Sequence, residues 1–187
     1  MKRTALILAI VSWSLSARAD VELKIITADG FVAFTVKDHW PVISMATEPP
    51  IMTAVFQLPN VADQGTPDST NLSIRFFDLG AAAARERFRS VGEPIGSVLP
   101  ERDAFEGWTV YQQQAKQGDT EYSIIDAKRD LDTLSVAVRI AWPHLKGNPR
   151  GYSDEMQQTF RSVLRSIYQH IGPYEPGENE VIRRRSP

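Results

Sequence analysis

The segment from Thr133 to Trp142 alternates between apolar and other side chains, and this pattern constrains the fold more than any other feature of the chain. A period of two places all of the apolar side chains on one face of a β-strand, whereas a helix would scatter them around its circumference. The segment therefore predicts a strand with one apolar face. The residues of that face are Leu134, Val136, Val138, Ile140 and Trp142.

Shorter β-rich runs predict the other strands of a mostly antiparallel body. Asp29-Gly30 predicts a tight turn that joins the first two runs into a hairpin, and Gly118-Asp119 predicts another turn later in the chain. Trp40-Pro41 ends the second run, because proline has no N–H to donate to a ladder. The predicted strands cover residues 21–27, 31–36, 51–58, 72–78, 105–113 and 121–127.

Two segments have helical periodicity. Residues 80–91 carry apolar side chains at spacings of three and four, and a second helix is predicted from an N-cap at Ser153 to a stop at Gly172-Pro173. The stripe of the second helix is typical of a helix that lies on a sheet. The predicted fold class is therefore α+β, with an antiparallel sheet packed by a long C-terminal helix and one shorter central helix. The stripe consists of Met156, Phe160, Val163, Leu164, Ile167 and Ile171.

Four segments stand in a recognisable order. They are a strand that leads to a tryptophan (Phe31–Trp40), Phe76-Phe77-Asp78 before the central helix, Gly-Trp-Thr-Val at 107–110, and a closing helix at Phe160–Ile167. This order resembles the PsbP/Mog1 fold group over most of the mature chain. The resemblance implies a PsbP/Mog1-like fold and a non-catalytic role in binding, assembly or chaperoning, and it implies no catalytic residues.

The first nineteen residues predict an export signal. A basic start is followed by an apolar run from Ala5 to Leu15, and Ala17-Arg18-Ala19 has the small-x-small pattern of a cleavage site. Cleavage is expected between Ala19 and Asp20, which predicts a periplasmic or secreted bacterial protein. The run is shorter than the ~20 apolar residues that span a bilayer, so no transmembrane segment is expected. The predicted organisation is a signal peptide at 1–19, a single domain at 20–172 and a flexible tail at 173–187.

Charge and composition limit the class of partner. Removal of the leader takes three of the 21 basic residues and leaves 18 against 23 acidic ones, a formal charge of −5. An acidic domain is not expected to bind nucleic acid, and its charge favours a basic protein partner. The chain has no cysteine. This excludes a lipid anchor on an N-terminal cysteine and also excludes thiol catalysis.

Neither metal binding nor a cofactor is predicted. The three histidines, His39, His144 and His170, stand far apart, and none has a second ligand at the spacing that zinc sites use. Three aspartates within residues 126–132 lack the glycine and the closing glutamate of a calcium-binding loop. A solvated hairpin turn is the expected structure there.

Catalysis is not predicted either. The sequence has no Gly-x-Ser-x-Gly elbow and no Ser-x-x-Lys. A Ser/His/Asp triad can assemble from distant positions, since triads are defined by geometry, but the histidines give no local indication of one. The protein is therefore expected not to be an enzyme.

Two Trp-Pro dipeptides provide the candidate recognition surface. His39 precedes Trp40 in one, and His144 follows Trp142-Pro143 in the other. If both strands end at the same rim, these side chains form an aromatic cluster that holds a partner. Alternatively, the tryptophans cap the core and the prolines block edge pairing.

The polar loop at residues 59–71 is the second candidate. Its carboxylates, Asp63 and Asp68, either reach into a basic groove of a partner or belong to a solvated connection. Together these observations predict an exported, non-enzymatic protein-binding module of the bacterial cell envelope, either a toxin-neutralising immunity-type protein or an assembly or chaperone factor. A small-ligand or lipid binder with an apolar pocket between sheet and helix is the alternative. An envelope hydrolase is a third class.

Overall fold

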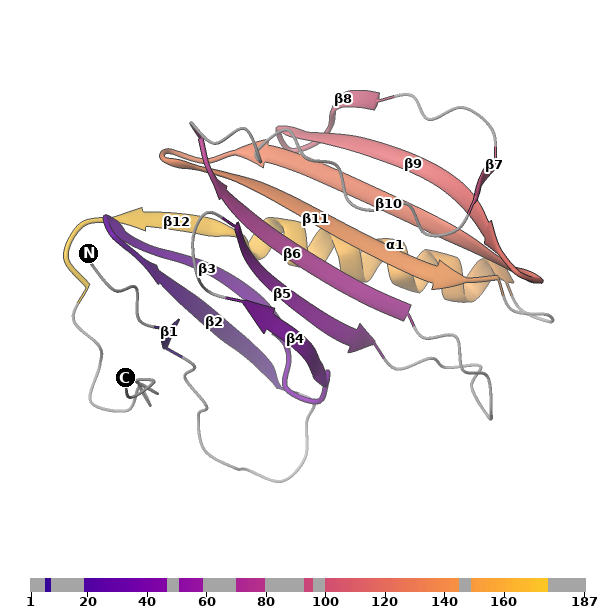
Figure 1. The fold of residues 1–187 in the computed structure, drawn as a ribbon, viewed down its shortest axis with the longest axis horizontal. Helices are drawn as coiled ribbons and strands as arrows, with labels where there is room; N and C mark the ends of the chain where they lie inside the picture. Colours follow the sequence, from indigo (N-terminus) through magenta and orange to yellow (C-terminus); the bar gives the residue numbers. More distant parts are fainter. Residues whose placement is uncertain are drawn as a thin grey trace. The chain divides into compact units, whose positions relative to one another are not determined.

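The computed structural model describes residues 6–7, 19–46, 51–58, 70–79, 93–95, 100–144 and 149–174. These residues form two antiparallel sheets and one helix, α1 (Pro149–Ser166) (Figure 1). The chain divides into two compact units, one formed by Met1–Trp40 with Arg161–Pro187 and the other by Pro41–Phe160. Helix α1 therefore contributes its first part to one unit and its last turns to the other.

The first unit contains a four-stranded sheet in the order β1-β2-β3-β12. Its strands are β1 (Leu6–Ile7), β2 (Asp20–Thr27), β3 (Gly30–Lys37) and β12 (Tyr168–Ile171). β2 and β3 pair from Asp20↔Lys37 to Thr27↔Gly30, which confirms the predicted hairpin. Leu23 and Ile25 alternate with less buried residues on β2, whereas β3 is buried at every position from Gly30 to Phe34. The short β12 pairs with β3 along the other edge of the hairpin.

The second predicted helix begins and ends later in the chain than α1 does. Helix α1 begins at Pro149 rather than Ser153, because proline fits the first helical position without losing a hydrogen bond. It ends at Ser166, and the next residues join β3 as a strand, with Tyr168 opposite Ala33 and Ile171 opposite Gly30. Periodicity alone did not reveal this end, since Ile171 continues the apolar spacing but is half-exposed on the strand.

Ser166 connects the end of α1 to β3 through its hydroxyl group. Ser166 Oγ accepts a hydrogen bond from the Thr35 N–H at 2.8 Å and donates one to the Val163 carbonyl at 2.7 Å. We expect Ser166→Ala to lower the free energy of unfolding by about 1–2 kcal/mol, because it leaves a partly buried backbone N–H without its acceptor. Urea denaturation measures this loss. Ser135→Ala, whose hydroxyl bonds to Asp130 at the surface, is the control and should cost less.

The second unit contains an eight-stranded sheet. The strand order is β4-β5-β6-β11-β10-β9-β7, and β8 also pairs with β9. Figure 1 shows the long strands β6, β11, β10 and β9 side by side. The strands are β4 (Val42–Ala46), β5 (Ile51–Leu58), β6 (Thr70–Asp78), β7 (Glu93–Ile95), β8 (Pro100–Phe105), β9 (Trp108–Gln117), β10 (Thr120–Asp130) and β11 (Leu134–Pro143).

The alternating strand predicted from the sequence is confirmed as β11, and it lies near the middle of this sheet. Its apolar face is buried, and the register continues that face onto both neighbours. Val138, for example, lies opposite Ile74 of β6 and Ala127 of β10. Met156 and Phe160, from the part of α1 that belongs to this unit, are buried as well. The predicted strands at 51–58, 72–78 and 121–127 and the turn at Gly118-Asp119 are also confirmed.

The predicted fold class, an α+β sheet packed by a long and a central helix, is wrong. The described residues are mostly β, in two antiparallel sheets with a single helix. The sequence did not predict five short strands, β1, β4, β7, β8 and β12, because two to six residues are too few to establish a period. It also joined two strands across Glu106-Gly107, where positive φ angles of 46° and 81° form a tight turn. The predicted helix at 80–91 lies outside the described residues.

Within the ranges that the structure describes, no helix has both the length and the apolar character needed to cross a membrane.

Candidate functional site

The core face of the second sheet becomes polar at one end. Trp142 of β11 lies opposite Ser123 of β10, and Ser123 lies opposite Gln114 of β9. Two residues further along, Ile125 lies opposite Gln112. Because paired residues of an antiparallel ladder point to the same side, these side chains share one face of the sheet. This face is apolar near its centre and polar where β10 begins.

A pocket of about 310 Å³ opens at this polar end, between the sheet and the beginning of α1. The helix contributes Ser153 and Gln157, two positions that lie one turn apart. The volume is at the lower end of the range for small-molecule sites. The pocket lies within the second unit and is lined by Gln112, Gln113, Gln114, Ser123, Ile124, Ile125, Trp142, Ser153 and Gln157.

The described residues that line the pocket carry no charge, but they are rich in groups that form hydrogen bonds. In the described part of the chain, the side chains of Gln112, Gln114, Ser153 and Gln157 form no hydrogen bond. Each glutamine amide supplies two donors and an acceptor, and the serine hydroxyl supplies both functions. The pocket is therefore suited to a neutral ligand with several hydroxyl, amide or carbonyl groups.

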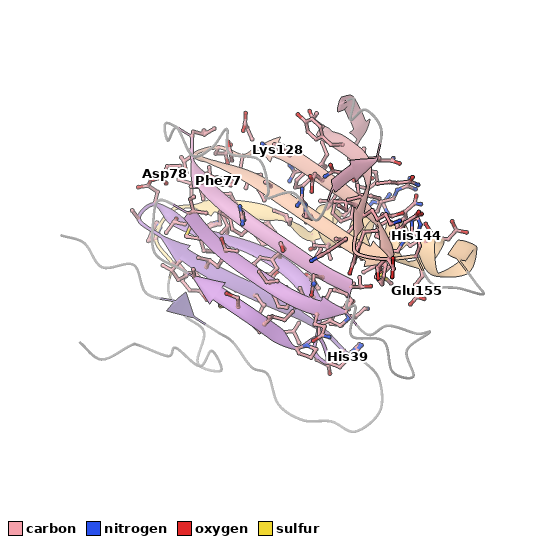
Figure 2. The ribbon with its side chains drawn as sticks, turned by 45° about the vertical axis from the view of Figure 1, so that its right-hand side comes forward. His39, Phe77, Asp78, Lys128, His144 and Glu155 are labelled. Carbon is pink, nitrogen blue, oxygen red and sulfur yellow. The ribbon has the colours of Figure 1, made fainter. Side chains whose placement is uncertain are left out.

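Ser123, His144 and Glu121 form a connected group beside the pocket. Ser123 Oγ lies 2.6 Å from Nε2 of His144, and Nδ1 of the same ring lies 3.5 Å from Glu121 Oε2. The backbone holds this arrangement in place, since the His144 N–H donates to the Glu121 carbonyl at 2.7 Å. Figure 2 shows His144 at the end of the sheet nearest the start of α1. We call these three residues the Ser–His–Glu group.

The opposite face of the sheet carries a buried ion pair. Arg139 of β11 donates to both carboxylate oxygens of Asp126 on β10, at 2.6 and 2.7 Å, and Gln113 of β9 adds a longer bond at 3.4 Å. Arg139 and Asp126 are direct cross-strand partners. A fork of this kind fixes both groups in one geometry, which indicates a structural role.

The predicted binding residues are divided between the two units. His39 and Trp40 belong to the first unit, where His39 lies beside Asp38 at the surface and Trp40 is buried. Trp142 and His144 belong to the second unit, where the buried Trp142 lines the pocket and His144 contacts Ser123, another lining residue. Asp63 and Asp68 lie outside the described residues.

The first sheet carries an aromatic cluster that the sequence did not predict. Phe31 stacks on His170 at 5.0 Å and meets Tyr168 and Tyr174 edge-on at 5.9 and 4.9 Å. Lys24 lies 5.2 Å from the Phe31 ring. Partial burial, followed by the charge of nearby Glu22, raises the pKa of Tyr168. These residues come from three strands and the segment after β12, so no local sequence motif predicts the cluster.

Two of the three aspartates at residues 126–132 are engaged with protein groups rather than gathered around an ion. Asp126 pairs with Arg139, and Asp130 accepts a hydrogen bond from Ser135. Among the residues that the structure describes, no three histidine or acidic side chains are placed to bind a metal ion.

The Ser–His–Glu group was not predicted from the sequence either. Ser123 and His144 are 21 positions apart, and only the register of β10 and β11 brings them together. The available signal was weak: Glu121 and Ser123 are two positions apart on one predicted strand face, and His144 follows the facing strand. Comparison with known proteins gives no match, either to a family model or to a curated protein. The resemblance to the PsbP/Mog1 group therefore stays a prediction.

Proposed function

We propose that the protein is an exported binding protein of the bacterial cell envelope and that the pocket between β9–β11 and α1 is its recognition site. The observation that carries the proposal is the lining itself, which presents, beside Trp142, amide and hydroxyl groups that form no hydrogen bond within the described part of the chain. Gln112 and Gln114 are exposed and Ser153 and Gln157 are half-buried, so all four side chains are accessible to a partner. Groups that remain available in a concave site are suited to those of a partner.

A protein partner is the first candidate, in the manner of an immunity-type protein or an assembly factor. The main-chain amides and carbonyls of a peptide segment match the glutamine side chains of the pocket, and the ring of Trp142 offers apolar contact. The charge of −5 expected after cleavage at Ala19 favours a partner of basic character. Binding of this kind should weaken as the salt concentration rises.

Capture from an envelope extract tests the role of the pocket. We expect the exported chain to be cleaved before Asp20, and to bind a specific protein whose affinity falls at least tenfold in the double variant Gln114→Ala/Gln157→Ala. Gln57→Ala, which removes an exposed glutamine of β5 away from the pocket, is the matched control and should bind normally. Equal capture by all three proteins would exclude the pocket as the contact site.

A small neutral ligand is the second candidate, and the size of the pocket favours it. The sequence predicted an apolar space between sheet and helix, whereas the lining is largely polar, so a lipid chain does not suit it. We expect native mass spectrometry of protein purified from the periplasm to reveal a retained low-mass compound that the double variant lacks. A clean protein mass in both cases would favour the protein partner.

A further inference from the structure

The Ser–His–Glu group has the connectivity that activates a serine for nucleophilic attack. In the tautomer with its proton on Nδ1, His144 presents that N–H to Glu121, and its Nε2 accepts the hydroxyl proton of Ser123 at 2.6 Å. A nucleophile, a base within hydrogen-bond reach and a third group that orients the base are the three parts of such a site. The 3.5 Å contact to Glu121 is long, as is common before substrate binds.

The position of the group adds a second, independent observation. Ser123 lines the pocket, and His144 is one residue beyond Pro143, at the end of the facing strand. A molecule in the pocket is therefore next to Ser123. Gln114 lies directly opposite Ser123 in the register, and its amide is a donor of the type that stabilises an oxyanion.

We propose that Ser123 is an acyl-accepting nucleophile, with His144 as its general base and Glu121 as a positioning residue. The substrate class that suits the pocket is a small neutral ester, since the lining residues that the structure describes carry no charge and offer amide and hydroxyl groups. This activity goes beyond the binding role and departs from the expectation that the protein is not an enzyme. It does not require the protein partner.

The reaction balances with water as the only co-reactant. Ser123 Oγ bonds to the ester carbonyl carbon while its proton moves to His144 Nε2. The bond from that carbon to the alkoxy oxygen then breaks, and the alcohol leaves with the proton from His144. Water attacks the resulting acyl-serine, gives a proton to His144, and releases the carboxylic acid as the serine recovers its hydrogen.

Covalent labelling tests the proposal without knowledge of the natural substrate. The purified exported protein is incubated with a small fluorophosphonate, which phosphonylates activated serines, and the adduct is located by tandem mass spectrometry. We expect one adduct, at Ser123, and none in Ser123→Ala. Ser135→Ala, which removes a surface serine of β11 outside the pocket, is the matched control and should be labelled at the wild-type rate.

Substitutions of the base, His144, and of the positioning residue, Glu121, should slow the reactions to different extents. His144→Gln should slow labelling and p-nitrophenyl acetate hydrolysis by about 10²-fold or more, with an unchanged melting temperature. Glu121→Gln should slow both reactions to a smaller extent, and Glu121→Asp should restore part of the loss.

Absence of an adduct on the wild-type protein, or labelling that His144→Gln leaves unchanged, would overturn the proposal. The wild-type result does not depend on whether any variant folds. Partner capture by the pocket variants is a different readout, so failure of the binding proposal would be seen separately.

Discussion

Gly30→Ala should detach β12 from β3 and lower the free energy of unfolding by roughly 3 kcal/mol. Gly30 begins β3 and lies opposite Ile171 of β12. A Cβ atom at this position would stand 1.9 Å from the carbonyl oxygen of His170, and the φ angle of +153° disfavours any L side chain. The β12 backbone must therefore move away, together with the hydrogen bond from the Gly172 N–H to the Asp29 carbonyl.

Urea denaturation and hydrogen exchange distinguish the detachment of β12 from the backbone strain that any L residue has at a positive φ angle. Gly118→Ala is the control, because Gly118 also has a positive φ angle, +60°, but an added Cβ meets nothing within 4 Å. The control should cost about 1 kcal/mol and leave the β12 amides protected. An equal loss in both variants, with β12 amides protected in each, would contradict the close approach of β12 to Gly30.

Gly30 also illustrates how far the sequence predicts this fold. The hairpin was correctly predicted from Ala28-Asp29-Gly30, since the signal is local, although the turn residues are Ala28 and Asp29 and Gly30 already begins β3. The second reason for glycine at this position, the passage of a strand from the far end of the chain, has no local signal. The same distinction explains β12 itself, whose residues continue a helical period but satisfy their backbone groups on β3.

The candidate site follows the same physical logic. Trp142 and His144 were selected because they end an alternating strand. Trp142 lines the pocket, and His144 contacts the lining residue Ser123. Ser123, Glu121 and the three pocket glutamines of β9 were not selected, because their importance depends on the register between β9, β10 and β11. A shift of one residue in that register would turn Ser123 to the other face. A site whose residues come together across strands therefore cannot be predicted from the spacing of those residues along the chain.

Asp126→Ala should have an effect as large as that of Gly30→Ala, through electrostatics rather than packing. The Arg139 side chain is only 8% exposed and the Asp126 side chain 13%, so both charges are largely removed from water. Removal of the carboxylate leaves a buried guanidinium without its bidentate partner, which typically costs 3–5 kcal/mol. We expect about 3 kcal/mol by urea denaturation, because Arg139 retains a further interaction in the protein.

Two comparisons determine whether the loss arises from the unpaired charge. Asp20→Ala breaks the exposed pair with Lys37, whose side chains are 59% and 43% exposed, and should cost less than 1 kcal/mol. The double variant Asp126→Leu/Arg139→Met removes both charges and retains volume, so it should recover most of the stability that Asp126→Ala loses. If the double variant were as unstable as the single one, the cost would come from packing on this face. Recovery would instead show that β10 and β11 need the two charges mainly to neutralise each other.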